Sequence, residues 1–452
     1  MGYVFYDTET SGLNRQFDQI IQFAAIITDE HFDPKKRFDL KLRLSPYVVP
    51  SPMALNVNGT PLANCYDPSR VSQLEGMKII HDFINQHSPA TFAGWNSIGF
   101  DEEILRHSFY RQLLGPFPTS MNNNARMDVM TIARAIDILQ PGSFTVPKGM
   151  DGEKSFKLQN ICTANGYSPR RAHEGLSDVE ACIFVARLLR EAAPEIWSSF
   201  AQTSRKHSAM DIIQRGQPCV FVSGWKEKTR AFVGVAIGKD LEIDAYSYVA
   251  DLAAPLADFQ SIESEAITEW FNQSPPPIER IKCNASPLAI PIDDLAEYDD
   301  TADILEDKAQ AILENEHLCN ALCSSFSRHI AHEFPDEYIE QKLYGGGWPT
   351  NDLNNQLRRF HNASWPDRLD IARTLPDIRY RKFAMRSIGE NAYRLFNDTE
   401  RAQYDMFITR RYRPDQPDVP WQTLSNIREK IAELPIGDQP SMQQQYESYF
   451  GI

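Results

Sequence analysis

The stretch YVFYDTETSG, residues 3–12, decides the fold of the N-terminal part of this chain. Its apolar residues predict a short buried strand that ends at Asp7, and Gly12 predicts a turn after it. Because side chains alternate along a strand, Asp7 and Glu9 face one side and Thr8 faces the other. Asp-x-Glu pairs also occur elsewhere in the chain as surface charge, but this one follows an apolar strand. Its two carboxylates therefore favour a site for a hard divalent cation.

Two more acidic motifs follow along the chain. Asp101 ends the segment NSIGFD, directly after an apolar run at 91–95 that predicts a buried strand. In the segment HEGLSD, His173 precedes Asp178 by five residues at the start of a predicted helix. Each motif alone is also compatible with a helix-capping Asp or a surface histidine. Together, four carboxylates and a histidine favour metal-assisted hydrolysis of a phosphodiester, with the histidine taking a proton from water.

The first third of the chain has the pattern of a mixed α/β sheet with helices packed on it. Runs at 19–28 and 37–44 predict two strands in addition to those at 3–7 and 91–95. Helices are predicted over 71–85, 101–113, 128–139 and 173–191.

The composition changes near Pro194. Apolar runs at 219–225, 230–237 and 241–249 predict a small β domain, and a long helical pattern covers 303–332. After the glycines at 345–347 the sequence predicts helices broken by prolines. A chain of 452 residues is too long for one core, so we expect three domains, at 1–193, 194–337 and 338–452.

Charge and cysteine content narrow the class of protein. The net charge of −15 argues against a protein that simply coats DNA, but 25 acidic residues against 11 basic ones lie between 194 and 337. Basic surface at the two ends can still meet phosphates. Seven cysteines without a CxxC pair, and no signal or bilayer-spanning run, predict reduced thiols in a cytoplasmic monomer. Cys319 and Cys323 are expected in a core rather than in a zinc site.

With these three motifs the chain resembles the DEDDh 3′→5′ exonucleases, which have a ribonuclease H-like fold. The segments GWN, FYR, SFKL and ANG, at 94–96, 109–111, 155–158 and 164–166, narrow the resemblance to the bacterial exonuclease I family. The segments VSG, IKCN and QKLYGG, at 222–224, 281–284 and 341–346, extend it over nearly the whole chain. The resemblance implies a ribonuclease H-like exonuclease domain, a small SH3-like β domain with helices and a helical C-terminal domain, which together enclose a groove for single-stranded DNA.

The resemblance also implies a reaction: Mg²⁺-dependent 3′→5′ hydrolysis of single-stranded DNA to 5′-mononucleotides, in DNA repair or recombination. Asp7 would bridge two Mg²⁺ ions, for which Mn²⁺ can substitute. Glu9 and Asp178 would complete one metal site, and Asp101 would serve the other through water. His173 would deprotonate the attacking water, and Glu9 would also hold the terminal 3′ hydroxyl.

Further residues are candidate DNA contacts. Leu13 is expected as a wedge against the last base. Candidate phosphate contacts and a stacking platform, each with solvated charge or a core aromatic as the alternative, are Lys157, Arg106, Arg126, Arg134 and Phe117. Lys157 stands where the family motif leads us to expect Arg, which keeps the charge but loses a bidentate contact.

Three other functions share the motifs: an RNA 3′→5′ exonuclease, a polymerase proofreading subunit and a non-enzymatic repair adaptor. RNA exonucleases of this type are short single domains, and a proofreading subunit would add only a small polymerase-binding tail, whereas this chain has about 250 further residues. A non-enzymatic adaptor would not need the five catalytic residues, all of which are present. The family resemblance implies a partner, the acidic C-terminal tail of the single-stranded DNA-binding protein, which ends in an apolar residue. Two basic and aromatic clusters, around Arg381 at 379–386 and Arg411 at 410–413, match such a peptide, or are ordinary exposed helix faces.

Overall fold

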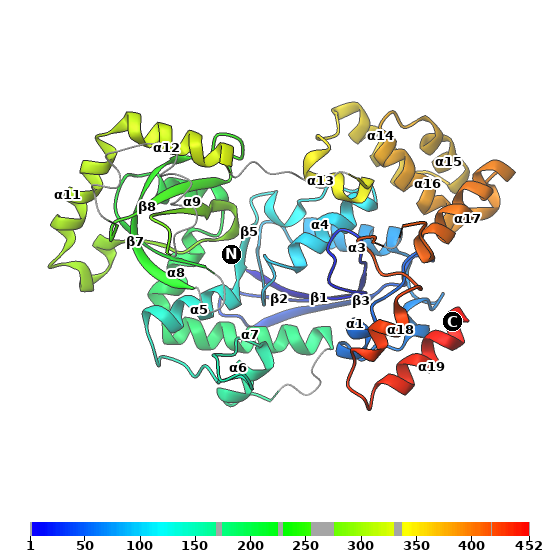
Figure 1. Ribbon diagram of the computed structural model, residues 1–452, viewed down its shortest axis with the longest axis horizontal. Helices are drawn as coiled ribbons and strands as arrows, with labels where there is room; N and C mark the ends of the chain where they lie inside the picture. Colours follow the sequence, from blue (N-terminus) through cyan, green and yellow to red (C-terminus); the bar gives the residue numbers. More distant parts are fainter. Residues whose placement is uncertain are drawn as a thin grey trace.

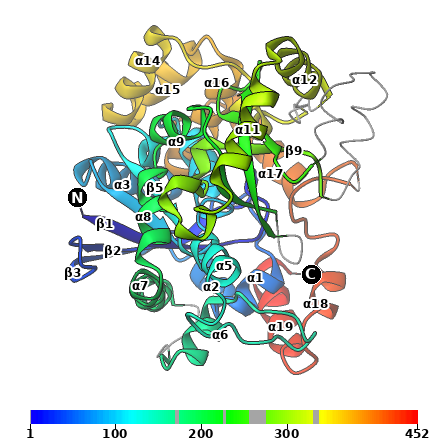
Figure 2. The same ribbon diagram turned by 90° about the vertical axis from the view of Figure 1, so that its left-hand side faces the viewer.

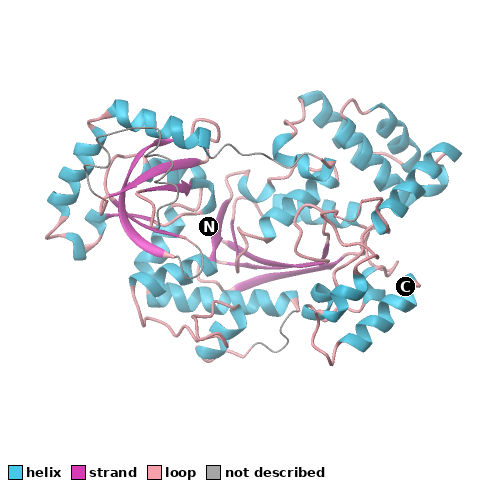
Figure 3. Cartoon of the chain, viewed as in Figure 1, coloured by secondary structure: helices cyan, strands magenta, loops and turns pink. Residues whose placement is uncertain are grey.

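The structure, a computed structural model, describes residues 2–168, 174–224, 229–254, 275–329, 337–416 and 418–451. Figure 1 shows one β-sheet in the centre of the molecule, a second sheet at one end and the C-terminal helices at the other. Figure 3 shows that strands are confined to the first two of these regions.

The central sheet has five strands in the order β3-β2-β1-β4-β5. They are β1 (Tyr3–Thr10), β2 (Ile20–Thr28), β3 (Pro34–Lys41), β4 (Thr91–Gly94) and β5 (Ala125–Asp128). β2 is antiparallel to β1 and β3, whereas β4 is parallel to β1 and β5. The mixed sheet is therefore as predicted, but β1 continues to Thr10, so Asp7 and Glu9 lie within the strand rather than at its end.

Helices cover both faces of this sheet, because apolar residues of the central strands alternate between the faces. Phe5 packs in a core with α5 (Val129–Leu139) and α7 (Gly175–Ala192). Val4 and Tyr6 pack in another core with α3 (Gln73–Gln86) and α4 (Asp101–Arg111). Figure 2 shows α7 below the strands and α3 above them. The helices up to residue 193 are α1 (Pro52–Val57), α2 (Leu62–Cys65), α3 (Gln73–Gln86), α4 (Asp101–Arg111), η1 (Pro118–Ser120), α5 (Val129–Leu139), α6 (Leu158–Ala164) and α7 (Gly175–Ala192).

The second sheet is antiparallel, with five strands in the order β10-β6-β7-β8-β9. Its elements are α8 (Pro194–Gln202), α9 (Lys206–Ile213), β6 (Cys219–Ser223), β7 (Arg230–Lys239), β8 (Tyr246–Asp251), β9 (Ile278–Lys282), η4 (Cys283–Ala285), β10 (Ala289–Pro291), η5 (Ile292–Asp294), η6 (Ala296–Tyr298), α11 (Ala302–Leu313) and α12 (Glu316–His329). The single helix predicted over 303–332 is two, because Asn315 accepts a hydrogen bond from the Leu318 amide and starts the second. Cys319 and Cys323 are buried in the core between this sheet and the two helices, as predicted.

The C-terminal part is helical. It contains η7 (Ile339–Gln341), α13 (Lys342–Gly345), α14 (Asn351–Asn362), α15 (Trp365–Thr374), α16 (Ile378–Ala392), η8 (Tyr393–Leu395), α17 (Asp398–Tyr412), α18 (Ile427–Ala432) and α19 (Gln439–Phe450). α17 begins with a capping box between Asn397 and Glu400. None of the helices in the described part of the chain is long and apolar enough to cross a bilayer.

The C-terminal helices share cores with the N-terminal part. Leu74, Tyr110 and Leu113 pack with α14 to α17, and α18 and α19 pack against α1 and α2. The main core of the central sheet also includes Val220 and Ile290 of the second sheet. Because cores cross residues 193 and 337, the three domain boundaries stay a prediction.

Candidate active site

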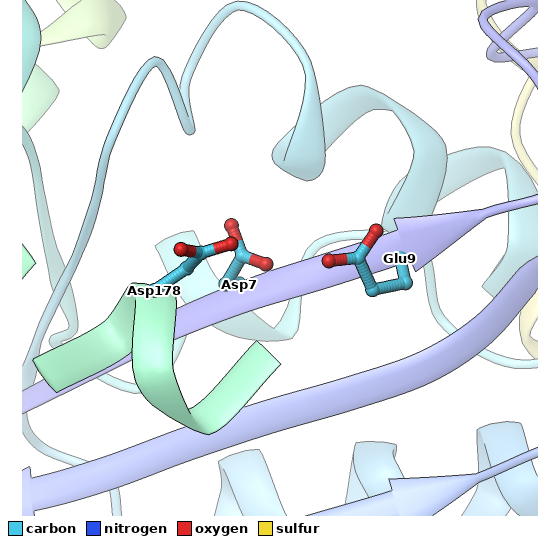
Figure 4. Close-up of side chains that lie close together, drawn as sticks. All are labelled: Asp7, Glu9 and Asp178. Carbon is cyan, nitrogen blue, oxygen red and sulfur yellow. The ribbon is translucent and has the colours of Figure 1, made fainter. Parts of the chain in front are cut away.

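Three of the predicted carboxylates meet on one side of β1. Asp7 and Glu9 are half-buried, while Thr8 between them faces the opposite side and is 7% exposed. Asp178 lies in the first turn of α7. One carboxylate oxygen from each residue lies within 4.8 Å of those of the other two (Figure 4). The strand alternation therefore produces the acidic cluster that the sequence predicts.

Small residues bring α7 close enough to complete this cluster. Ala24 of β2 is the direct partner of Asp7 in the sheet. A Cβ atom on Gly175, the first residue of α7, would lie only 2.9 Å from the Ala24 Cβ. Any larger residue at Gly175 would therefore push the first turn of the helix, and Asp178 with it, away from β1.

The acidic cluster is electrostatically unfavourable by itself. Burial raises the pKa of Asp7 well above its usual range, and the charges of Asp101, Glu9 and Asp178 raise it further. Burial, together with Asp178 and Asp101, raises the pKa of Glu9 to about 8. No ion pair joins Asp7 or Glu9 to a basic side chain of the described residues. A divalent cation would relieve this repulsion, and three carboxylates are suitable oxygen ligands for it.

Asp101 lies at the edge of this cluster. It is the first residue of α4 and 5% exposed, and its Oδ1 accepts hydrogen bonds from the Thr8 amide at 3.0 Å and the Thr8 hydroxyl at 2.5 Å. Burial raises its pKa to about 7, against the lowering effect of these bonds. Asp101 is therefore close enough to act on the charge of Asp7, but its role as a metal ligand stays a prediction.

Asp128 is a structural residue of the site that the sequence reasoning missed. At the end of β5, its carboxylate accepts hydrogen bonds from the amides of Asn96 and Ile98 at 3.1 Å each, and from Met130 and Thr131 at the start of α5. Asn96 has a positive φ of 58°. Asp128 thus fixes the loop that leads to Asp101. The available signal was its place as a capping residue between a strand and a helix.

Two predicted phosphate contacts, Arg106 and Arg126, are engaged by the protein itself. Both pair with Glu102, whose side chain is 1% exposed, at 3.4 and 3.3 Å. Arg106 also pairs with Glu103 at 2.7 Å, and Arg126 also donates to the Asn284 carbonyl. Because both arginines are buried, the alternative of solvated surface charge does not hold for them. Both line the wall of a cavity, and their role as phosphate contacts stays a prediction.

This cavity, of about 820 Å³, has Ile98 and Gly99, from the loop that leads to Asp101, in its wall. Its basic lining residues, besides Arg106 and Arg126, are Arg15, Arg205, Lys206, His207 and Lys282. Its aromatic lining residues are Phe117, Tyr246, Tyr344 and Trp348. Trp348 is 61% exposed and lies edge-on to Phe117, with ring centroids 5.4 Å apart. Phe117 was predicted at such a surface, whereas Trp348 was missed.

The other predicted DNA contacts lie outside the lining of this cavity. Leu13 is 82% exposed. Lys157 is exposed and precedes α6, and half-buried Arg134 lies over the Phe156 ring at 5.2 Å. His173 lies outside the described residues. The roles of these residues stay predictions.

The two clusters expected to bind a partner differ. Arg381 is half-buried, donates to the Leu375 carbonyl at 2.8 Å, and lines a cavity of about 520 Å³ with Lys382, Met385 and Phe407. Arg411 is 5% exposed and pairs with Glu340 at 3.3 Å. The expectation of an accessible Arg411 is therefore corrected, because a buried carboxylate binds its guanidinium.

Comparison with known proteins finds similarity to exonucleases. Residues 4–186 match the exonuclease family model RNase_T. Exodeoxyribonuclease I of Haemophilus influenzae is 27% identical over 380 residues, which cover 78% of each chain. The same enzyme of Buchnera aphidicola subsp. Schizaphis graminum is 31% identical over 233 residues, 50% of this chain and 47% of the relative. The chain is thus similar in sequence to exodeoxyribonuclease I from several bacteria. In the Buchnera comparison, it spans about half the length of the relative.

Solved structures confirm the fold. Escherichia coli exonuclease I in complex with a dA16 oligonucleotide superposes with a TM-score of 0.83 at 20% identity, over 100% of this chain and 99% of the other. A structure of SSB/exonuclease I in complex with the inhibitor CFAM has a TM-score of 0.82 at 20% identity, over 99% of this chain and 98% of the other. A zinc-bound E. coli exonuclease I with single-stranded DNA also has a TM-score of 0.82 at 20% identity, over 100% of this chain and 98% of the other. The ribonuclease H-like α/β fold and the resemblance to exonuclease I, both expected from the motifs, are thereby confirmed.

Proposed function

We propose that this protein is a Mg²⁺-dependent 3′→5′ exonuclease that hydrolyses single-stranded DNA to 5′-mononucleotides in DNA repair or recombination. The observation that carries the proposal is the cluster of Asp7, Glu9 and Asp178 on β1 and α7, together with a cavity lined by cations and aromatic rings whose wall includes the loop before Asp101. The exodeoxyribonuclease I relatives support the same activity.

The carboxylates fit a hard divalent cation. Asp7, Glu9 and Asp178 would hold it, with Asp101 beside them, because burial and mutual repulsion leave Asp7 and Glu9 in need of positive charge. When bound, Mg²⁺ supplies a Lewis acid that stabilises negative charge on the phosphate oxygens during displacement. Thr8 and Asp128 orient the chain around the site through the hydrogen bonds to Asp101 and to the loop before it.

His173 is the proposed general base. It precedes Asp178 by five residues, and Asp178 is in the first turn of α7. A neutral imidazole on the segment before this helix can take a proton from the attacking water. Glu9, nearest the turn that follows β1, is the proposed partner of the terminal 3′ hydroxyl.

The cavity suits a single strand. Aromatic rings such as Trp348 and Phe117 can stack on bases of any sequence, and Arg15 and Lys282 can bind phosphates. Arg106 and Arg126, although paired with Glu102, still contribute positive charge to the wall. A duplex would bury its bases away from these rings, so we propose a preference for unpaired DNA.

We further propose that the acidic tail of SSB binds the C-terminal helices at the cavity around Arg381. Cations and apolar side chains meet there: Arg381 and Lys382 line it with Met385, Phe407 and Ile378, which is 53% exposed. An acidic peptide with an apolar end needs both kinds of contact. A tail peptide followed by fluorescence anisotropy should lose affinity on Arg381→Ala or Lys382→Ala. It should not do so on Arg410→Ala, an exposed arginine outside the cavity.

The test of the main proposal is turnover of end-labelled substrates. Single-stranded DNA, single-stranded RNA of the same sequence and blunt duplex DNA are each incubated with and without Mg²⁺, and the products are resolved by length. Rapid Mg²⁺-dependent release of mononucleotides from the 3′ end of single-stranded DNA is expected. Faster turnover of RNA would identify a ribonuclease, and binding of DNA without any turnover would identify an adaptor.

A further inference from the structure

The loop at residues 11–19, between β1 and β2, leads directly from Glu9 to the cavity. It carries Leu13, which is 82% exposed, and Arg15, which lines the cavity and lies 5.9 Å from the Phe100 ring centroid. The position of this loop therefore decides where Leu13 and Arg15 stand relative to the carboxylates.

Internal hydrogen bonds give the loop its shape. The Asp18 carboxylate accepts from the Ser11 hydroxyl at 2.7 Å and from the Asn14 amide at 2.8 Å. The Ser11 amide donates to the Gln19 carbonyl at 2.9 Å. A Cβ on Gly12 would lie 2.5 Å from an Asp18 oxygen, so the turn is closed over this carboxylate.

The C-terminal part of the chain holds the same loop from outside. The Asn14 side-chain amide donates to the Pro420 carbonyl at 2.5 Å. The Phe17 ring, 3% exposed, contacts Trp421 at 5.4 Å and Tyr338 at 5.8 Å between ring centroids. These contacts join positions more than 300 residues apart in the sequence.

A buried arginine fixes Trp421 in turn. The Trp421 indole donates to the Arg411 carbonyl at 3.0 Å, and the Arg411 guanidinium lies 4.1 Å from the Trp421 ring centroid and 5.3 Å from that of Phe17. Glu340 neutralises Arg411. The result is a continuous stack from the C-terminal helices to the loop beside Glu9.

From these contacts we infer that Trp421 and Asn14 are positioning residues for hydrolysis. The C-terminal segment holds the 11–19 loop so that Leu13 and Arg15 meet the end of the DNA strand in register with the carboxylates. This inference rests on the proposed exonuclease function and adds to it, because it gives the last part of the chain a role in the chemical step as well as in binding. Misplacement of a substrate by about 1 Å can cost about a hundredfold in rate.

The test compares Trp421→Ala with Trp365→Ala. Trp365 is also half-buried in the C-terminal part, where it packs beside Arg368 away from the loop. Steady-state turnover of single-stranded DNA gives kcat and KM, and thermal melting gives the stability of each variant. Trp421→Ala should lower kcat by between about tenfold and a hundredfold with little change in KM. Trp421→Phe should restore most of it, and Trp365→Ala should keep kcat near wild type.

A second variant covers the case in which Trp421→Ala does not fold. Asn14→Ser supplies a hydroxyl that can accept from the Gln16 amide, as the Asn14 side-chain oxygen does at 3.0 Å, but it lacks the amide nitrogen that donates to Pro420. It should lower kcat without lowering the melting temperature. Wild-type kcat in both Trp421→Ala and Asn14→Ser, or equal losses in Trp421→Ala and Trp365→Ala, would overturn the inference. A wild-type protein that does not degrade DNA would instead overturn the proposed function.

Discussion

Two groups of carboxylates in this protein have opposite electrostatic surroundings. Glu340, 3% exposed, lies between Arg386 at 2.8 Å and Arg411 at 3.3 Å. Burial acts to raise its pKa, but the two arginines outweigh burial and hold the pKa below its usual range. Among the described residues, the charged groups that act on Asp7 and Glu9 are other carboxylates, and the pKa values of both are raised.

The difference separates a structural site from a functional one. Glu340 has its counter-charges within the chain, so it joins η7 to α16 and α17 and needs nothing from solution. The carboxylates on β1 and α7 keep an unfavourable charge that a cation from solution would offset. Clustered, repelling carboxylates are a feature that folding alone does not select, and this favours a role in binding metal.

The largest effect on activity, and the strongest test of the contrast between these two sites, is expected for Asp7→Asn and Asp178→Asn. Each removes a proposed metal ligand while preserving side-chain shape, so hydrolysis should fall below detection while the fold is kept. Stability without Mg²⁺ should stay the same or rise, because a repelling charge is removed. Turnover assays and thermal melting measure the two effects, with Asp33→Asn, an exposed carboxylate, as the control. Near wild-type turnover in either variant would show that the metal assignment is wrong.

The next effect is expected for His173→Ala. Loss of a general base lowers the rate by about 10²–10⁴-fold. Affinity for single-stranded DNA should change little, because the carboxylates and the cavity wall remain. Single-turnover kinetics and anisotropy separate the two quantities. A loss confined to KM would show that His173 positions the substrate instead.

Sequence reasoning found what local pattern determines. Asp7, Glu9 and Asp178 were predicted because strand alternation and a helix start are readable within ten residues. β5 was missed because four residues, ARMD, are too few to show alternation, and Asp128 was missed with it. The burial of Arg126 and Arg411 could not be predicted, since their partners Glu102 and Glu340 lie 24 and 71 positions away. In the sequence, an arginine near aromatic residues gives the same pattern whether or not a carboxylate elsewhere in the chain pairs with it.

Glu340→Gln should lower the stability of the protein, whereas Asp7→Asn should leave stability unchanged or raise it. The Glu340 substitution leaves Arg411 buried without a counter-charge, and breaking a buried pair in this way costs about 3–5 kcal/mol of unfolding free energy. Urea denaturation of wild type and variant measures the difference. Glu314→Gln, which replaces an exposed carboxylate at the end of α11, should lower the free energy of unfolding only a little. Equal stability of Glu340→Gln and wild type would show that this carboxylate is not the counter-charge that the arginines require.

The smallest effect concerns the pH dependence of stability in the metal-free protein. Burial lowers the pKa of His107 and His361, both between the N-terminal part and the C-terminal helices, to about 4 each. Unfolded histidines bind protons near pH 6.5, so stability is complete above that pH and falls as the pH drops toward 4. Each histidine should cost on the order of 1–3 kcal/mol at pH 4. Glu9, with its pKa raised to about 8, has the opposite sign, because the folded state binds its proton first and gains stability as the pH falls below 8.

Asp7 and Asp101, whose pKa values are also raised, act in the same direction as Glu9, so stability without metal should decline as the pH rises from 6 to 9. The two histidines oppose this gain at lower pH. Urea denaturation from pH 4 to pH 9 measures the profile. Mg²⁺ should remove the decline between pH 6 and pH 9, because a bound cation favours the ionised carboxylates, and should leave the contribution of the two histidines unchanged. Asp7→Asn should also flatten the high-pH side, whereas His107→Leu should reduce only the acid slope. A profile that is flat from pH 6 to pH 9 without metal would contradict the repulsion among the carboxylates, and with it the contrast to Glu340.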